Sequence, residues 1–353
     1  MFEPKQFTRN VGIRQRSLRK HCRFGRATEL VYVLATGTVL TIAGTSVEAQ
    51  DIWNGGDDNW NTGALGNWVD GQFDDGNSAT FNGAGDTVTI DEGATLNVGG
   101  ITFGDNGITI DADNQANDQI NLTAPVTVTN GSDTATINAN ITGNAEADGA
   151  GSLNLAGTVG GNVTNTGAGT VTITNTVSGN LDSDAGTTIV DTNGEITGTT
   201  TIDNSTVVVD NTGAGTGGIL SDTVTVNSGG TLDVNAGSVA DVDTTGTGVA
   251  DISGGTVASL DQDSTGTSTL SGGSITGDVT VSNGTLNVTG TGTISGTTTV
   301  SAGTLDVDGG TVGDVDTTGT GVADISGGTV ASLDQDSTGT STLSGGSITG
   351  DVT

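Results

Sequence analysis

The chain has 353 residues, of which 61 are Gly and only 3% are aromatic. Its formal net charge is −33, and all eight Lys and Arg residues lie within the first 26 positions. The 38 acidic residues after position 50 have no basic partner in that part of the sequence. This charge repels phosphate backbones and anionic lipid, so we expect no nucleic-acid partner and no direct membrane insertion of residues 50–353.

Residues 50–353 also contain no His, Cys, Lys or Arg. A Ser-His or Cys-His nucleophile pair is therefore excluded from this segment, as is a zinc site built from His and Cys. We expect the protein not to be an enzyme and to have no catalytic residues, no bound cofactor and no defined metal site.

The N-terminus has the pattern of a secretory signal peptide over residues 1–49. A basic region is followed by the apolar stretch 30–44, and Val47 and Ala49 supply the small or short residues of a cleavage site. We predict cleavage between Ala49 and Gln50. A membrane anchor is the alternative, but the stretch 30–44 is shorter than the roughly 20 residues that a spanning helix needs.

Residues 50–110 are predicted to form an aromatic-rich capping module. They hold Trp53, Trp60, Trp68, Phe73, Phe81 and Phe103. Short alternating segments such as 87–90 and 95–98 predict strands with one apolar face. A stacked array needs its first layer covered, and the aromatic cluster suits that role. The alternative is an aromatic platform that binds sugar.

Residues 111–353 are dominated by a repeat. Residues 241–280 recur without a change at 314–353, which defines a 73-residue unit. A shorter period of 18–19 residues divides this unit, as in the offsets from Val163 to Leu181 and from Val171 to Ile189. The 73-residue unit therefore predicts four coils. Since the second copy stops in mid-repeat, we also expect a fragment truncated at its C-terminus.

These patterns predict an all-β fold: a parallel, right-handed β-helix or solenoid with coils of about 18 residues. Val, Ile and Leu are expected to point inward, and Thr, Ser, Asp and Asn outward. The segment after residue 49 corresponds to roughly 17 coils and a rod of about 80 Å at the strand spacing. An array of β-sandwiches is the alternative, because short strands bounded by turns are common to both.

The segment 296–307, Gly-Thr-Thr-Thr-Val-Ser-Ala-Gly-Thr-Leu-Asp-Val, resembles the strand repeat of bacterial autotransporter passenger domains. Related copies lie at 224–234, 279–288 and 198–209. The resemblance implies export to the surface or outer membrane of a Gram-negative bacterium, or release outside the cell. It also implies a β-helical passenger whose partner is a C-terminal translocator barrel of the same protein.

Pairs of nearby acids are the remaining candidates for chemistry: Asp57/Asp58, Asp74/Asp75, Asp111/Asp113, Asp241/Asp243 and Asp261/Asp263. Two carboxylates could serve a glycosidase. However, Val242 takes the inward phase between Asp241 and Asp243, and this pair recurs at 314 and 316, which is unusual for a catalytic centre. We interpret the acids as solvated side chains that bind calcium loosely at most.

The sequence thus favours a non-catalytic, structural or adhesive rod. The partners it predicts are a host or surface glycan, or other copies of the same protein. A soluble secreted matrix or surface-layer protein is the first alternative. A polysaccharide-active β-helix enzyme is the second, and it would need a non-repeated insertion with clustered carboxylates.

Overall fold

The computed structural model describes residues 32–33, 39–40, 50–53, 56, 58–60, 73–90, 93, 95–113 and 115–353. Contacts divide the chain into two units, Met1–Val47 and Glu48–Thr353. In the first unit, β1 (Tyr32–Val33) pairs antiparallel with β2 (Val39–Leu40). Otherwise the predicted signal peptide lies outside the described residues, as do Ala49, Asp57 and Trp68.

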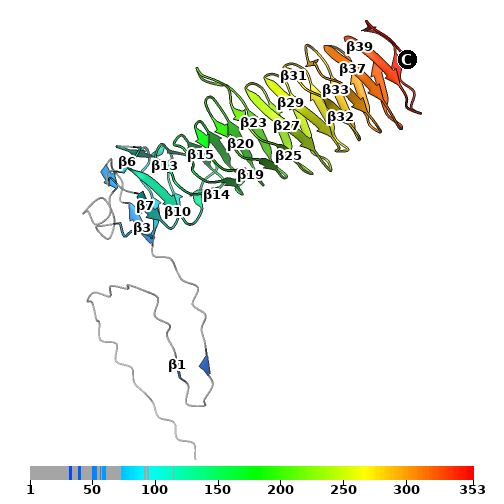
Figure 1. Cartoon of the computed structure of the whole chain (residues 1–353). Coiled ribbons are helices and arrows are strands. Elements are labelled where there is room, and N and C mark those ends of the chain that lie inside the picture. The colour runs from blue at the N-terminus through cyan, green and yellow to red at the C-terminus, as the bar shows by residue number, and fades with distance from the viewer. Residues whose placement is uncertain are drawn as a thin grey trace, which may run out of the picture. The chain divides into compact units, whose positions relative to one another are not determined.

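The second unit is a parallel β-solenoid whose described elements are all strands. Successive coils stack along one direction, from the blue and cyan strands to the red ones (Figure 1). Each regular coil contributes one strand to each of three faces, and every strand pairs in parallel with its counterpart in the next coil. The predicted all-β parallel solenoid is therefore confirmed.

Face 3 is a sheet of 15 strands. Its strands are β4 (Asp58–Trp60), β6 (Thr87–Ile90), β9 (Ile108–Ala112), β12 (Thr134–Ile137), β15 (Ser152–Leu155), β17 (Thr170–Ile173), β20 (Thr187–Val190), β23 (Thr206–Val209), β26 (Thr231–Val234), β28 (Val249–Ile252), β30 (Thr267–Leu270), β33 (Thr285–Val288), β36 (Thr304–Val307), β38 (Val322–Ile325) and β40 (Thr342–Leu343).

Face 1 is built from short strands. They are β7 (Thr95–Val98), β10 (Gln119–Leu122), β13 (Asn140–Ile141), β18 (Thr176–Val177), β21 (Glu195–Ile196), β24 (Ile219–Leu220), β31 (Ser274–Ile275), β34 (Thr293–Ile294) and β41 (Ser347–Ile348). A bridge at Val159 joins β13 to β18.

Face 2 follows face 1 in each coil. Its strands are β3 (Gln50–Trp53), β5 (Ser78–Phe81), β8 (Ile101–Phe103), β11 (Val126–Val128), β14 (Ala145–Ala147), β16 (Val163–Asn165), β19 (Leu181–Ser183), β22 (Thr200–Ile202), β25 (Val224–Val226), β32 (Val279–Val281) and β35 (Thr298–Val300). Four longer strands run through both faces: β27 (Ser238–Thr244), β29 (Thr256–Gln262), β37 (Thr311–Thr317) and β39 (Thr329–Gln335).

Strict alternation of burial explains why these segments form strands. In β26 the side chains of Leu232 and Val234 are buried, whereas Thr231 and Asp233 lie on the outer surface. Side chains alternate between the two faces of a strand, so the second and fourth residues of such a segment point inward. These positions line the core with branched apolar side chains. A continuous apolar core extends from Trp53 to Leu333.

The 18-residue period is confirmed in register. Val163 pairs with Leu181, and Thr231 pairs with Val249. Further pairing leads from Thr267 to Thr285 and then to Thr304. Thr304 thus lies four coils beyond Thr231 and is its counterpart in the next 73-residue unit, so the repeated unit is a block of four coils.

Two details of the sequence prediction are wrong. Val171 pairs with Thr188, not with Ile189, because that coil is one residue shorter than its neighbours. The expected 17 coils are too many, because several coils exceed the 18-residue period. The step from Asp58 to Val88 is the longest of them, and the step from Thr206 to Thr231 is also extended.

The aromatic residues of the 50–110 segment form the interior of the first coils. Trp53, Phe81 and Phe103 follow one another in paired strands of face 2. The Trp60 ring lies 5.1 Å from that of Phe73 and 5.3 Å from that of Phe81. All five rings are buried. Buried rings are not available as a platform for sugar, so that alternative is wrong for these five residues.

Candidate functional surface

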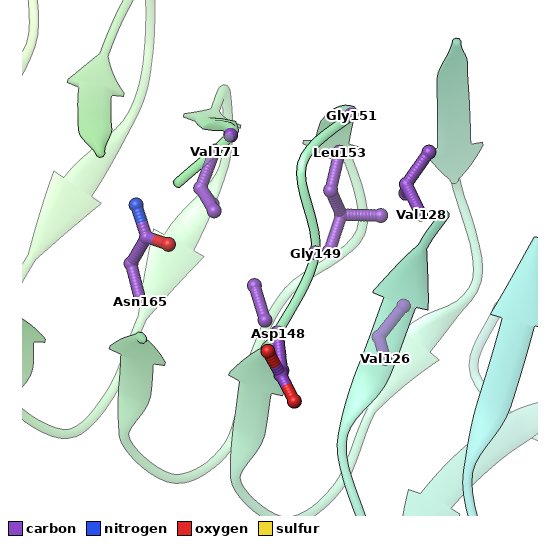
Figure 2. Close-up of a pocket in the computed structure, with 10 residues that line it drawn as sticks. Val126, Val128, Asp148, Gly149, Gly151, Leu153, Asn165 and Val171 are labelled. Carbon is purple, nitrogen blue, oxygen red and sulfur yellow. The ribbon is translucent and has the colours of Figure 1, made fainter. Parts of the chain in front are cut away.

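The cavity between coils that Figure 2 shows offers no room for a substrate. It measures about 10 Å³ and is lined by Val126, Val128, Leu153, Asn165 and Val171, among others. A volume of roughly 10–15 Å³ holds a single water molecule at most. It is a packing defect between coils.

A second, shallow hollow opens where face 1 turns into face 2. It has a volume of about 160 Å³ and is lined by Leu122, Thr123, Ala124, Asn144 and Glu146. Ligand pockets are typically about 300–1,000 Å³. The hollow contains one carboxylate, whereas glycoside hydrolysis uses two.

The acid pairs predicted from sequence lie on the outer surface wherever their side chains are described. Asp241 is exposed and Val242 is buried, as the alternation predicts. The Asp241 carboxylate accepts a hydrogen bond from the Ser259 hydroxyl at 2.7 Å. Asp75 accepts hydrogen bonds from Asn97, and Asp111 accepts one from the Ala112 amide. The side chain of Asp58 lies outside the described part of the chain.

The structure pairs acids between coils rather than along a strand. Asp243 lies directly beside Asp261 in the sheet, and Asp316 beside Asp334. Face 3 has the equivalent neighbours Asp233 and Asp251, and Asp306 and Asp324. The acid pairs predicted from the sequence are adjacent or two residues apart along the chain. They do not include these pairs between coils, although the 18-residue period would have revealed them.

Burial and neighbouring charges raise the pKa values of Asp233, Asp243 and Asp306. Partial burial, followed by the charges of Asp263 and Asp261, raises the pKa of Asp243. Burial and the charges of Asp308 and Asp324 likewise raise the pKa of Asp306. At Asp243 and Asp306 the surroundings therefore favour the protonated carboxyl more than water does.

The corner between faces 1 and 2 carries a ladder of side chains. The Asn144 Oδ1 accepts a hydrogen bond from the Asn162 amide at 2.9 Å, and the Asn162 Oδ1 accepts one from the Asn180 amide at 3.0 Å. A Cβ atom on Gly161 would lie 2.3 Å from the Asn144 Oδ1. The Gly-Asn pairs at these corners therefore leave room for the ladder.

The same corner position continues with acids that alternate with hydroxyl residues. In chain order the residues are Asp241, Ser259, Asp278, Thr297, Asp314, Ser332 and Asp351. Ser332 donates to Asp314 at 2.6 Å, and the Thr297 amide donates to Asp278 at 2.9 Å. The alternation keeps like charges two coils apart, roughly 10 Å at the strand spacing.

Face 1 presents a row of hydroxyl side chains that contains no acid over seven successive coils. The paired residues are Ser238, Thr256, Ser274, Thr293, Thr311, Thr329 and Ser347. This hydroxyl row is uncharged, whereas the outer rows of faces 2 and 3 carry the acid pairs. Along this row, neighbouring coils therefore present no like charges to one another.

One insertion interrupts the repeat between β23 and β24. Residues 211–216 are exposed and form a loop that projects from the stack (Figure 1). Asp191 anchors it, because its carboxylate accepts hydrogen bonds from the amides of Thr192 and Thr212 and from the Thr212 hydroxyl. Burial tends to raise the pKa of Asp191, but these hydrogen bonds outweigh it and lower the pKa. Asp191 thus has a structural role as an ionised anchor.

Within the described residues, no group of three or more His, Cys, Asp or Glu side chains is arranged to hold a metal ion. The described part of the chain also contains no helix long and apolar enough to cross a membrane.

Comparison with known proteins found no match to any family model, to any curated protein or to any solved structure.

Proposed function

We propose that this chain is the rod-forming passenger of an exported, autotransporter-like surface protein with a structural or adhesive, non-catalytic role. The observation that carries the proposal is the repetition of one polar surface over successive coils. At the strand spacing, 15 stacked strands correspond to a rod of about 70 Å. The hydroxyl row runs through seven successive coils, and the acid pairs recur every four coils.

A repeated surface suits adhesion through many weak contacts. Each coil presents a similar short row of Ser, Thr and Asp side chains, so one coil binds weakly. When one extended partner contacts several coils, its overall affinity rises, because each contact after the first forms at a high effective concentration. An enzyme would instead concentrate its function in a single non-repeated site.

Deletion of residues 241–313 tests the adhesive role. Because residues 314–353 repeat 241–280, this deletion joins Ala240 to Asp314 and removes four coils without creating a new coil junction. Cells that display the shortened rod should adhere less strongly to a surface or to one another, and the rod should remain folded by circular dichroism. Equal adhesion by both rods would contradict a role for the repeated surface.

Export is tested separately by expressing the intact gene in a Gram-negative host. We expect the exported protein to begin at Gln50 and to be accessible to protease on intact cells. Recovery from the medium without cell attachment would favour the secreted matrix alternative. Uncleaved protein retained in the cytoplasm would overturn the proposal.

A further inference from the structure

An inward row of face 2 breaks the rule that the core is apolar. From β16 to β39 it consists of the last residue of each strand that runs along face 2. Two polar residues alternate with two apolar residues along this row: Asn165, Ser183, Ile202, Val226, Thr244, Gln262, Val281, Val300, Thr317 and Gln335. The polar pairs therefore recur every four coils.

The middle polar pair belongs to a buried hydrogen-bond network. The Gln262 Oε1 accepts hydrogen bonds from the Thr244 hydroxyl at 3.1 Å and the Ser268 hydroxyl at 2.6 Å. The Gln262 Nε2 donates to the Ser264 hydroxyl at 2.7 Å and to the Gly266 carbonyl at 3.3 Å. All four side chains are fully buried. The amide of Gln262 thus uses both its acceptor and its donors.

The first polar pair makes a similar network with the amide in the other coil. The Asn165 Nδ2 donates to the Thr188 hydroxyl and the Thr187 carbonyl, both at 3.2 Å. The hydroxyls of Ser183 and Thr188 lie 3.2 Å apart. Asn165 occupies the place of Thr244, and Ser183 that of Gln262. The long amide side chain and the short hydroxyl have exchanged coils.

The third pair belongs to the exact sequence copy. Gln335 donates to the Ser337 hydroxyl and to the Gly339 carbonyl, and the Ser341 hydroxyl accepts a hydrogen bond from the Ala323 amide at 3.0 Å. Here the Thr317 hydroxyl donates to the Asp334 carbonyl, and the Gln335 Oε1 has no hydrogen-bond partner among the described residues. Three networks therefore occupy equivalent coils, and the third lacks the hydrogen bond between its threonine and its glutamine. Sequence identity reveals only the second and third of them.

We infer that these networks are register locks, one in each of three copies of a four-coil block, and that the first copy has diverged. Within the outer rows, one Thr, Ser or Asp could pair with another at little cost, and the same holds for Val, Leu and Ile within the inner rows. A slip of two residues between strands keeps the inward and outward faces, so these rows oppose it weakly. Such a slip would separate Gln262 from Thr244 and leave their polar atoms unpaired in the core.

Disulfide trapping tests the lock. With Cys22→Ser as background, Asp243→Cys/Asp261→Cys reports the native register, because Cα atoms of paired residues lie about 4.8 Å apart. Asp243→Cys/Ser259→Cys reports a two-residue slip, since these Cα atoms are roughly 8 Å apart in the native register, too far for a disulfide. Each pair is oxidised after refolding, and the cross-linked fraction is measured by mass spectrometry.

With Thr244 and Gln262 in place, we expect the first cysteine pair to form its disulfide almost completely and the second pair to form very little. The variant Thr244→Val/Gln262→Leu removes the lock but keeps the apolar character of neighbouring coils, and its slipped disulfide should increase about tenfold, the factor expected for one lost net hydrogen bond. An unchanged slipped fraction in this folded variant would overturn the inference.

A second variant decides the question if the apolar variant does not fold. Thr244→Asn/Gln262→Ser copies the arrangement of Asn165 and Ser183 into the middle block. It should fold and form only the native disulfide. Failure to fold, or formation of the slipped disulfide, would show that the first and second networks are not equivalent.

Discussion

At the scale of single residues, buried polar groups distinguish one coil from another. Thr244 and Thr298 are both buried on face 2, but only the Thr244 hydroxyl has a hydrogen-bond partner among the described residues. Thr298 lies between Val279 and Val315 in its row. Its hydroxyl therefore has lost water without gaining a partner, which is unfavourable.

The first prediction is that Thr298→Val stabilises the protein by about 1 kcal/mol, because valine fills the same volume without an unpaired hydroxyl. Denaturant unfolding followed by circular dichroism measures this change. Thr299→Val is the matched control, since the Thr299 side chain lies on the outer surface of the same strand and its substitution should have little effect. A lower unfolding free energy for Thr298→Val would contradict the prediction.

The second prediction concerns pH. Burial and neighbouring carboxylates raise the pKa values of Asp233, Asp243 and Asp306 above 3.8. The folded state therefore binds protons more readily than the unfolded state, so these groups make the protein more stable as pH falls from neutrality toward about 4. Asp191 acts in the opposite sense: its contribution is lost only as pH falls below 3.8 and through its lowered folded pKa.

Unfolding by urea at several pH values checks the sign. We expect the unfolding free energy to rise on mild acidification, and the rise to become smaller in Asp251→Asn and Asp261→Asn, which remove charged neighbours of Asp233 and Asp243. Glu146 lies on the outer surface of a different coil, so Glu146→Gln is a control that should keep the native pH profile. Loss of stability on mild acidification would refute the prediction.

At the scale of elements, the corners determine where each strand ends. Asn144, Asn162 and Asn180 connect successive corners through side-chain acceptors for backbone amides. Each such bond satisfies an amide that the strand ladder leaves free at the turn. The four strands β27, β29, β37 and β39 run through this corner position without a break. There the ladder position is occupied by Asp241, Ser259, Asp314 and Ser332.

The third prediction is that Asn162→Ala destabilises the protein by about 1–2 kcal/mol, because it removes the acceptor of the Asn180 amide. Thermal or denaturant unfolding provides the measurement. Asn154→Ala is the control, since the Asn154 side chain makes a long hydrogen bond of 3.4 Å to Thr136 on the outer surface. Equal effects of the two substitutions would contradict a special role for the ladder.

At the scale of the whole molecule, net charge opposes the stack. The segment after residue 50 has 38 acids and no basic side chain, so the coils repel one another at low ionic strength. Salt shortens the range of this repulsion, with a Debye length of about 10 Å at 0.1 M. Charges are closer together in the folded solenoid than in the unfolded chain, so screening should stabilise the folded state more.

The fourth prediction is therefore that the melting temperature rises with salt and with calcium. If calcium acts by screening, NaCl and CaCl₂ should raise the melting temperature by similar amounts at the same ionic strength. A rise that saturates at micromolar calcium would reveal a specific site. Scanning calorimetry of residues 50–353 in graded NaCl and CaCl₂ distinguishes these outcomes. A melting temperature independent of both salts would refute the screening argument.

The sequence by itself determined the fold class, the length of the coil and the four-coil block. These follow from local alternation and from the offset between the two identical segments, which can be read along the chain without any knowledge of contacts. Alternation also placed Asp241 and Val242 on their correct sides. The right-handed coil, export and adhesion remain predictions.

Only the tertiary structure decided the register between coils. A coil shortened by one residue pairs Val171 with Thr188, and an insertion beyond the 18-residue coil is accommodated before β26. Such differences change the register from coil to coil, so the equivalence of Asn165 and Ser183 with Thr244 and Gln262 was not visible in the linear pattern. Contacts across a parallel sheet join residues whose separation along the chain varies from coil to coil, and the sequence period specifies that separation only on average.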